Sequence, residues 1–456
     1  MMIVERPSTK RIQMMTMPNN SNDKDTSCNL QRRTFVKKAS LGAAAVSLSP
    51  LAAPFVQAQN GNNKVLKVGV VGLGGRGAGA MNNILAADPN TKIWAVADIF
   101  ERRLKGFENR NGARIDTEGR KRVFLGFDGY QKVIDSGVDI VILATPPVFR
   151  PQHFAASIAA GKHVFMEKPF ANDIPGLKSV VDNAKKAQSA GLSVMTGLVW
   201  RYSPHLMELH KRIQDGQIGD VLSVSSTYCG SRRPNTMPDI KFKEKSGLSD
   251  MEWALKFWQN YLELSGDGIM EFMIHGLDKM SWAMGDQMPE KCMGMGANTM
   301  PVVGANNWDQ FALNYQYADG RRADFMGRQI PGAYAVSGDA ITGSKGFASL
   351  ESKGGASITI DGKIVWQKKG GLGYKNEHEI LLQHIRSGKV FNDVLGKMEH
   401  SHALAIMGRT ASYTGQLITK DQIMSSTDEL IKVEGMNFDT PFTPRPAAEV
   451  GVTKFS

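Results

Sequence analysis

Short apolar runs alternate with helical segments through the first half of the chain. The helical period appears in PQHFAASIAAG and PGLKSVVDNAKKAQSAG, and the strand-like runs are VLKVGVVG, TKIWAVADIF, VDIVILATPP, KHVFMEKP and LSVMTGLVW. Near-continuous apolar strands separated by helices are typical of a parallel sheet covered on both faces. The pattern predicts a doubly wound α/β domain over residues 59–199.

After Trp200 the period of the apolar positions changes to two. It is clearest in DVLSVSSTY, WDQFALNYQYADGRRADFMGR, FASLES and ASITIDGKIVW, with hairpin turns at ADG and IDG. Alternation with tight turns indicates a largely antiparallel sheet. Two helices, NEHEILLQHIRSG and HSHALAIMGRTASYTGQ, complete a predicted α+β domain over residues 200–456. The Pro-rich tail FDTPFTPRPAAEVGVTKFS is expected to run extended over the surface or a partner subunit.

The N-terminal segment has a different pattern. Arg32 and Arg33 precede an Ala-rich apolar run that ends in VQA at Ala58, and this order resembles a twin-arginine export signal. We therefore expect residues 1–58 to be a signal peptide, with Met14 or Met17 as alternative starts, and we expect the mature protein to be exported to the periplasm. No later stretch offers about 18 uninterrupted apolar residues, so no membrane span is predicted.

Composition narrows the class of protein. The 456 residues are 42% hydrophobic and 22% charged, as in a soluble globular chain of two domains. The formal charge is +11, but the first 58 residues hold eight of the 55 Lys and Arg and three of the 44 Asp and Glu, which leaves +6 for the rest. Without a dense basic patch interleaved with aromatics, no nucleic-acid partner is predicted. Cys229 and Cys292 are too few for a disulfide framework, although one bridge remains open.

A glycine-rich turn follows the first strand. In VGVVGLGGRGAGA the residues Gly72, Gly74 and Gly77 have GxGxxG spacing between a strand and a helix, with Gly75 and Arg76 inside the turn. Such glycines allow a tight turn, close approach to a pyrophosphate and close helix packing.

The next strand ends at Asp98, where a carboxylate accepts hydrogen bonds from ribose hydroxyls and repels a 2′-phosphate. This favours NAD over NADP, although Arg76, Arg102 and Arg103 keep NADP open.

The following strands carry a family resemblance. VILATPPVFRPQHFAASIAAGKHVFMEKPF and QIGDVLSVSSTY resemble the Gfo/Idh/MocA oxidoreductases over nearly the whole chain after residue 58. The resemblance implies a Rossmann domain followed by an open, mostly antiparallel sheet that often mediates oligomerisation, hence a homo-oligomer, either dimer or tetramer. It also places Thr145, Pro146, Glu167 and Lys168 at the cofactor.

The helix IMEFMIHGLDKMSWAMG has apolar residues on every side and yet carries several ionisable ones. Glu271, His275 and Asp278 lie four and three residues apart, which predicts one shared face. The resemblance implies that Lys168 is the active-site lysine and His275 the acid/base. Glu271 stands where relatives carry Asp or Tyr, and Asp278 matches an HxxD ending that supports the histidine.

These residue types suit alcohol oxidation. A neutral histidine can take the hydroxyl proton, a lysine can stabilise the developing alkoxide, and a carboxylate one turn before His275 can orient its ring. A metal site is not predicted, because the helix lacks a second His or Cys at ligand spacing. The many methionines between residues 270 and 300 are interpreted as core packing rather than copper ligands.

Substrate contacts are harder to assign. A long segment, SRRPNTMPDIKFKEKSGLSDMEWALKFWQNYLELSGDG, precedes this helix and resembles an insertion in secreted Bacteroidetes and Planctomycetes members of the family. Its aromatic and basic side chains suit a sugar ring and its hydroxyls. The candidate substrate contacts are Arg201, Tyr202, Trp258 and Arg328, with Arg232, Arg233, Trp253 and Tyr261 as further candidates.

Together these features predict an NAD-dependent oxidoreductase acting on a secondary alcohol of a sugar, glycoside or cyclitol, with a tightly held cofactor. The alternatives are a glycoside hydrolase similar to family 109, which uses transient oxidation, and a non-catalytic sugar- or nucleotide-binding module. The intact Lys168 favours the first.

Overall fold

A computed structural model describes residues 64–111, 115–231, 238, 241–351 and 354–455. The chain divides into two compact units, and the second, Asn60–Ser456, holds every described residue. The predicted signal peptide, Arg232 and Arg233 lie outside the described residues. No helix in the described part of the chain is long and apolar enough to cross a membrane.

The first domain is built on a parallel sheet. In the described residues it has the strand order β3-β2-β1-β4-β5-β6, with the doubly wound arrangement that the sequence predicts. The strands are β1 (Leu66–Val71), β2 (Thr91–Asp98), β3 (Val123–Leu125), β4 (Ile140–Leu143), β5 (His163–Met166) and β6 (Val194–Thr196). The helices between them are α1 (Gly75–Ala87), α2 (Glu101–Asn111), α3 (Gly129–Asp135), α4 (Arg150–Ala159) and α5 (Ile174–Ser189). β4 is buried at every position, as expected for a strand covered on both faces.

The second domain contains the larger sheet, of order β14-β13-β12-β11-β7-β10-β9-β8-β15 in the described residues. Its pairs are antiparallel except that β10 runs parallel to β7. The strands are β7 (Val221–Gly230), β8 (Lys291–Ala297), β9 (Gln310–Gln316), β10 (Arg322–Gln329), β11 (Val336–Gly343), β12 (Phe347–Leu350), β13 (Gly355–Ile360), β14 (Lys363–Lys369) and β15 (Ile418–Thr419). The strands β3, β8, β11 and β15 are not among those predicted from the sequence; β3 and β15 are very short, and KCMGMGA of β8 holds no β-branched or aromatic residue.

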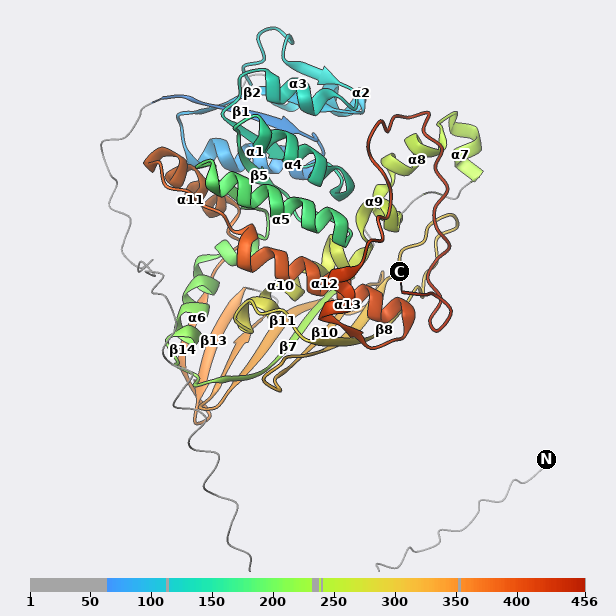
Figure 1. The fold of residues 1–456 in the computed structure, drawn as a ribbon. Coiled ribbons are helices and arrows are strands. Elements are labelled where there is room, and N and C mark those ends of the chain that lie inside the picture. Colours follow the sequence, from blue (N-terminus) through green and yellow to red (C-terminus); the bar gives the residue numbers. More distant parts are fainter. Residues whose placement is uncertain (1–63, 112–114, 232–237, 239–240, 352–353, 456) are drawn as a thin grey trace, which may run out of the picture. The chain divides into compact units, whose positions relative to one another are not determined.

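Helices separate the two sheets (Figure 1). α10 (Ile274–Ala283) and α12 (Glu399–Thr414) pack on each other and on strands of the second sheet, and α12 also contacts α5. α11 (Tyr374–Ser387), although late in the chain, packs on α1 of the first domain. The remaining helices are α6 (Pro204–Gln214), α7 (Lys241–Ser246), α8 (Asp250–Lys256), α9 (Leu262–Ser265) and α13 (Lys420–Ser425).

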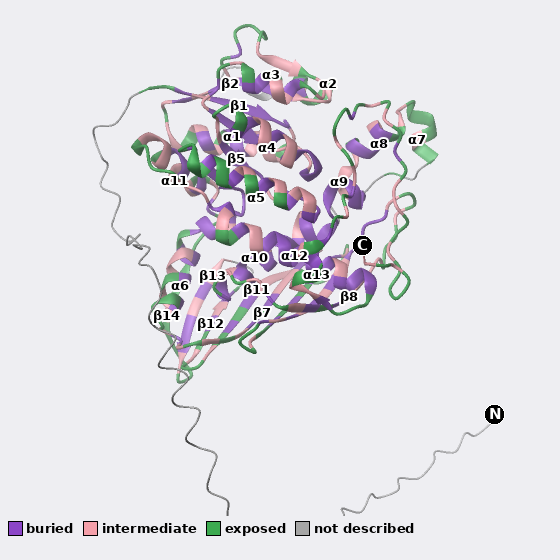
Figure 2. Cartoon of the chain, viewed as in Figure 1, coloured by how far each residue is buried: buried purple, intermediate pink, exposed green. Residues whose placement is uncertain are grey.

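A second, smaller core joins the insertion to the C-terminal tail. It unites α8 and α9 with Met436 and Phe442 of the tail and with Val148 and Phe149 of the first domain. α8 is accordingly mostly buried, whereas α7 is exposed (Figure 2). The tail thus runs over the surface of its own chain, as one of the two sequence-based alternatives proposed.

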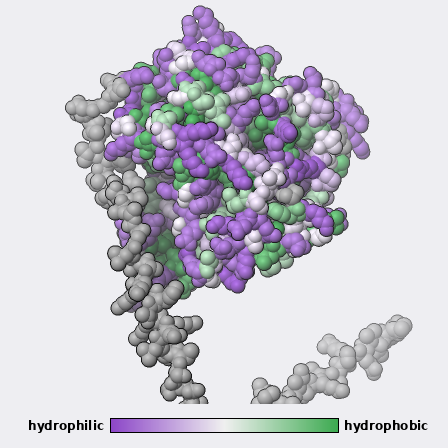
Figure 3. Space-filling view, in the orientation of Figure 1, coloured by the Kyte–Doolittle hydropathy of each residue, from purple (hydrophilic) through white to green (hydrophobic). Residues whose placement is uncertain are grey.

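The methionines do not all follow the predicted core role. Met270, Met273 and Met280 are buried, but Met293 and Met295 on β8 are 56% and 73% exposed. Their neighbours Cys292 and Gly294 face inward, so alternation directs these methionines to the opposite face of the sheet. Elsewhere, on the face drawn in Figure 3, apolar side chains lie in small groups between polar ones.

Candidate active site

The glycine turn leaves an open wall at the start of α1. Gly72 has φ +91°, and a side chain there would clash with the backbone of Ala144. A Cβ at Gly77 would collide with the carbonyl of Gly72. At Gly75, by contrast, a Cβ would meet nothing within 4 Å. Gly72 and Gly77 therefore shape the turn, while Gly74 and Gly75 line a cavity at the helix N-terminus, where backbone N–H groups favour an anion.

Asp98 lies at the predicted place, at the end of β2 and in the cavity wall. Its carboxylate accepts backbone hydrogen bonds from Leu73 at 2.8 Å and Phe100 at 2.9 Å. Burial raises the pKa of Asp98, and these hydrogen bonds and Arg103 oppose the rise. The carboxylate is thereby fixed where a ribose hydroxyl would approach.

Arg76 and Glu167 form an ion pair beside the glycine turn. The guanidinium donates through Nε at 2.9 Å and through a terminal nitrogen at 2.6 Å to one oxygen of Glu167, and it lies over the ring of Tyr374 on α11. With its donors directed at Glu167, Arg76 is poorly placed to select a 2′-phosphate.

All the predicted cofactor residues except Gly77 line one cavity of about 430 Å³. Thr145 and Pro146 follow β4 there, and the buried Thr145 hydroxyl has no hydrogen-bond partner in the described structure. Arg150 and His153 of α4 also line the cavity, and sequence reasoning missed both. Burial lowers the pKa of Arg150 to about 10 and that of His153 to about 3.

Lys168 and Glu271 meet at the other end of this cavity. The ammonium donates to the backbone carbonyl of Glu271 and lies 3.9 Å from its Oε1. Burial lowers the pKa of Lys168, and the negative charges of Glu271 and Glu167 oppose that shift. Gln259, from the turn Trp258–Asn260 of the insertion, donates to the same Oε1 at 3.0 Å.

Glu271 lies in a π-helical turn, Ile269–Met273, that leads directly into α10. Turns of this kind are frequent at functional sites because they displace side chains from the α-helical register. The prediction that Glu271 orients His275 is not supported, since the carboxylate engages Lys168 and Gln259 instead.

His275 lies one turn beyond Glu271 and is partly exposed, but it is not among the cavity-lining residues. Its Nδ1 has no partner within the described structure, and its ring lies 5.9 Å from that of Tyr228. Burial lowers the pKa of His275 well below 6.5, and the positive charges of Lys168 and Lys279 add to the shift. The imidazole is therefore neutral at physiological pH, as a proton acceptor requires.

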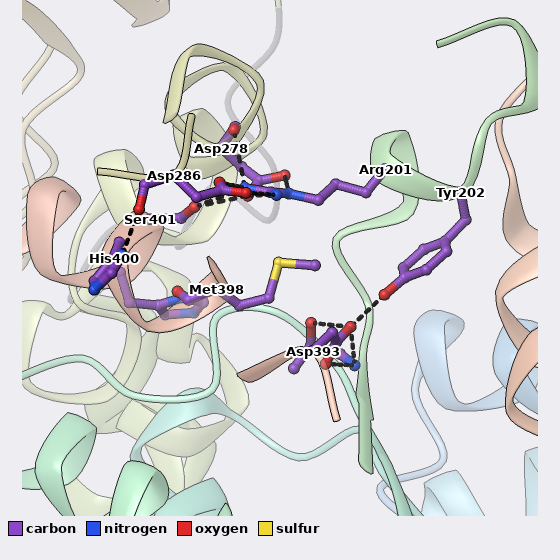
Figure 4. Close-up of polar contacts among 10 residues, drawn as sticks. Arg201, Tyr202, Asp278, Asp286, Asp393, Met398, His400 and Ser401 are labelled. Atoms are coloured by element: carbon purple, nitrogen blue, oxygen red, sulfur yellow. Dashed lines mark hydrogen bonds and ion pairs between the residues drawn. The ribbon is translucent and has the colours of Figure 1, made fainter. Parts of the chain in front are cut away.

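Asp278 does not share the face of Glu271 and His275. Its carboxylate accepts hydrogen bonds from Nε of Arg201 at 2.9 Å and from the hydroxyl of Ser401 at 2.7 Å (Figure 4). A terminal nitrogen of the same guanidinium donates to Asp286 at 2.6 Å. Both Asp278 and Arg201 are buried. This placement argues against a substrate contact for Arg201 and against support of His275 by Asp278.

Of the other candidate substrate residues, some line the cavity and some do not. Tyr202 is buried and donates to Asp393 (Figure 4), and Arg328 on β10 donates to the carbonyl of Tyr334 at 3.0 Å. Neither lines the cavity, whereas Trp258 does.

Two further aromatic candidates have a packing role. Trp253 and Tyr261 are buried in the smaller core, where Tyr261 contacts Phe442.

The described residues contain neither a metal site nor a disulfide bond. Among the described residues no cluster of three His, Cys, Asp or Glu could hold a metal ion. Cys229 and Cys292 are buried and unbridged.

The sequence matches two family models. Residues 66–196 match an oxidoreductase family with an NAD-binding Rossmann fold, and residues 206–349 match the Gfo/Idh/MocA C-terminal domain. The chain belongs to the Gfo/Idh/MocA oxidoreductase family.

Individual relatives of this Gfo/Idh/MocA chain are distant. Inositol 2-dehydrogenase of Rubrobacter xylanophilus is 24% identical over 298 residues, 65% of this chain and 75% of that protein. A glycosyl hydrolase family 109 protein of Streptomyces coelicolor is 23% identical over 61% of this chain and 53% of its own. Levoglucosan dehydrogenase in complex with NADH has the same fold, with a TM-score of 0.62 and 15% identity over 78% of this chain and 98% of its own.

The residues of this family member fit a dinucleotide. The open side of Gly74 and Gly75 can admit a pyrophosphate, Asp98 can receive ribose hydroxyls, and the unpartnered Thr145 hydroxyl faces the same cavity. When bound, NAD would supply the hydride acceptor or donor.

Proposed function

We propose that the protein is an NAD-dependent oxidoreductase that moves a hydride between a secondary alcohol of a sugar, glycoside or cyclitol and a nicotinamide cofactor. The observation that carries this proposal is the single cavity that joins the glycine turn and Asp98 to Lys168 and Glu271. Dinucleotide-binding and proton-handling groups are thus within reach of one bound pair of cofactor and substrate.

The chain's own residues then handle the substrate oxygen and its proton. Lys168 donates a hydrogen bond to the substrate oxygen and stabilises the charge that develops as the proton leaves. His275, neutral and without a partner at Nδ1 in the described structure, accepts that proton. Glu271 offsets the charge of Lys168 and is the competing proton acceptor, because it lies in the cavity wall.

Turnover of purified protein tests the proposal. A panel of sugars, cyclitols and glycosides should give net NADH or a keto product with at least one substrate. Lys168→Met should lower kcat by about a thousandfold, because the alkoxide loses its donor; full turnover by this variant would contradict the mechanism. His275→Ala and Glu271→Gln identify the proton acceptor, since the larger loss of kcat falls on the residue that takes the proton.

A second candidate is a glycoside hydrolase that oxidises its substrate only transiently. The match to the Streptomyces family 109 protein favours it. In the same assay, release of an aglycone without net NADH would identify a hydrolase, and binding without either product would identify the non-catalytic alternative.

We further propose that the cofactor is held tightly by the tail. The C-terminal strap, residues 430–445, begins where Leu430 donates its N–H to Asp173 at 3.0 Å. It ends where the N–H of Arg445 binds Glu263 at 2.6 Å. Between these anchors Phe438 packs on Phe100 and Phe127, at ring distances of 5.5 and 5.0 Å.

Both of these phenylalanines line the cavity beside Asp98, so the strap covers its adenosine end. Mass spectrometry of the purified protein should find NAD bound.

Export and oligomerisation complete the proposal. The twin-arginine pattern supports loading of the cofactor before export and its regeneration on site by a second substrate, and cell fractionation tests this localisation. The exposed Met293, Met295 and Met326 on the open sheet support a homo-oligomer formed through that face. Light scattering of the purified protein measures its mass.

A further inference from the structure

A second, smaller pocket adjoins the cavity behind Glu271 and Gln259. It has a volume of about 20 Å³, and these two side chains line both spaces. That volume admits one group of the size of a water molecule. The pocket therefore suits a single substituent of a molecule bound in the larger cavity.

The chemistry of the pocket is that of carboxamides. Its amide side chains are Gln259, Asn260, Asn307 and Gln329. A carboxamide offers both donors and acceptors, which matches a hydroxyl group. Among the described residues that line the pocket only Glu271 is charged, and no cationic side chain lines it to hold an anionic substituent.

We propose that this hydroxyl pocket is a substrate subsite for one uncharged hydroxyl group next to the reacting carbon, and that Gln259 is its specificity-determining residue. The inference rests on the proposed function and narrows its substrate class to neutral polyols and sugars, without a carboxylate or phosphate at that position.

The hydrogen bond between Gln259 and Glu271 explains the selectivity. Gln259 Nε2 donates to Glu271 Oε1 at 3.0 Å. An entering hydroxyl accepts from the amide and donates to the carboxylate, so two hydrogen bonds replace one. A deoxy analogue has no group to insert there, so it leaves the bond between Gln259 and Glu271 in place and gains neither of the two new hydrogen bonds.

Gln259 is also held in place from behind. Its backbone carbonyl accepts from the side-chain amide of Asn307, and that amide also reaches the Ser265 hydroxyl at 3.3 Å. The insertion is thereby tied to the loop before β9, so the amide of Gln259 is positioned by the second domain.

Gly268 offers a way to fill the pocket without removing a polar group. Its φ of −57° and ψ of −30° suit alanine. A Cβ there would lie 3.3 Å from Gln329 Oε1 and from the carbonyl of Trp308. Gly268→Ala therefore places a methyl group in the subsite. Gln259→Leu removes the side-chain amide that would donate to the substrate hydroxyl.

The test uses purified protein with bound NAD and a defined panel: D-glucose, its single-position deoxy derivatives, D-xylose, D-glucuronate and myo-inositol. Calorimetry measures binding, and NADH absorbance measures kcat/KM.

Wild type should discriminate against one deoxy position, and against the acid, by about tenfold or more. Both variants should lose that discrimination because kcat/KM falls for the parent sugar, whereas kcat/KM for the deoxy analogue should change less than about threefold. Gly371→Ala, on a loop where a Cβ meets nothing within 4 Å, is the matched control and should behave as wild type.

Each outcome decides the question. Uniform loss on every sugar, or no change in discrimination, overturns the subsite. Selective binding without turnover supports the subsite and overturns the proposed function, whereas neither binding nor turnover of any sugar overturns both.

Discussion

Glu271 and Arg201 illustrate how the tertiary structure assigns roles to charged residues. Both follow from the sequence as candidates for substrate chemistry, yet only Glu271 lies in the cavity wall. Arg201 is enclosed by two carboxylates, so its charge is neutralised within the fold. Two charged residues with the same standing in the sequence are thus a cavity-lining carboxylate in one case and a buried ion-pair member in the other.

The charge of Glu271 should be visible in the pH dependence of activity. Burial lowers the pKa of Lys168, and Glu271 is the largest influence that raises it again. In Glu271→Gln that opposing charge is absent, so the Lys168 pKa falls further and the lysine loses its proton at lower pH. The alkaline limb of a kcat/KM profile should therefore shift to lower pH. Gln259→Leu, which keeps the charge, should leave the limb in place, and an unshifted limb in Glu271→Gln would contradict the prediction.

Arg201→Met should reduce stability rather than substrate affinity. The substitution leaves Asp278 without its buried counter-charge, at a cost of about 3–5 kcal/mol. Urea denaturation measures this cost, and KM for the sugar should be unchanged. Arg212→Met, at the half-exposed pair with Glu208, should cost less than about 1 kcal/mol. A raised KM with unaltered stability would restore Arg201 as a substrate residue.

At the scale of elements, the insertion and the tail behave as one unit. Ser249 caps α8 and donates to the carbonyl of Phe438, so the helix and the strap share a hydrogen bond as well as a core. This unit lies beside the loops that follow β2 and β4, and both loops line the cavity.

Phe438→Ala should speed the release of NAD. Removing the ring uncovers Phe100 and Phe127, and the rate of cofactor dissociation should rise by about tenfold or more, which corresponds to about 1.4 kcal/mol. Loss of bound NAD on dilution, followed by fluorescence, gives the rate. Phe242→Ala, at an exposed phenylalanine of the same insertion, serves as the control. Equal rates in both variants would rule out retention by the strap.

At the scale of the whole molecule, α11 of the second domain packs on α1 of the first domain. The ring of His378 on α11 packs at a tilt against that of Phe165 on β5, with the ring centres 4.2 Å apart, and neither nitrogen of the histidine has a partner in the described structure. Burial lowers the pKa of His378 to about 3. The contact between the two halves of the chain therefore depends on a neutral imidazole.

This contact should weaken in acid. The folded pKa of about 3 lies below the usual 6.5, so the unfolded state binds more protons as the pH falls below 6.5 and stability is lost there. In His378→Phe that loss is absent. When the pH is lowered from about 7.5 to 5, the free energy of unfolding of the variant should therefore rise by about 2 kcal/mol relative to that of wild type. Leu381→Ala, at a buried site of the same helix, should keep the wild-type pH dependence. Denaturant unfolding at both pH values checks this, and parallel curves for His378→Phe would contradict it.

The sequence by itself determined the two-sheet architecture, the glycine turn and Asp98. These features depend on local period, turn chemistry and short spacing, which a linear pattern records. The tertiary structure alone decided which face each polar side chain takes. Glu271, in a π-helical turn, lies beside Lys168, Arg201 pairs with Asp278, and the insertion that lines the cavity packs on a tail distant in sequence. Such contacts depend on residues far apart in the chain, and no local period encodes them.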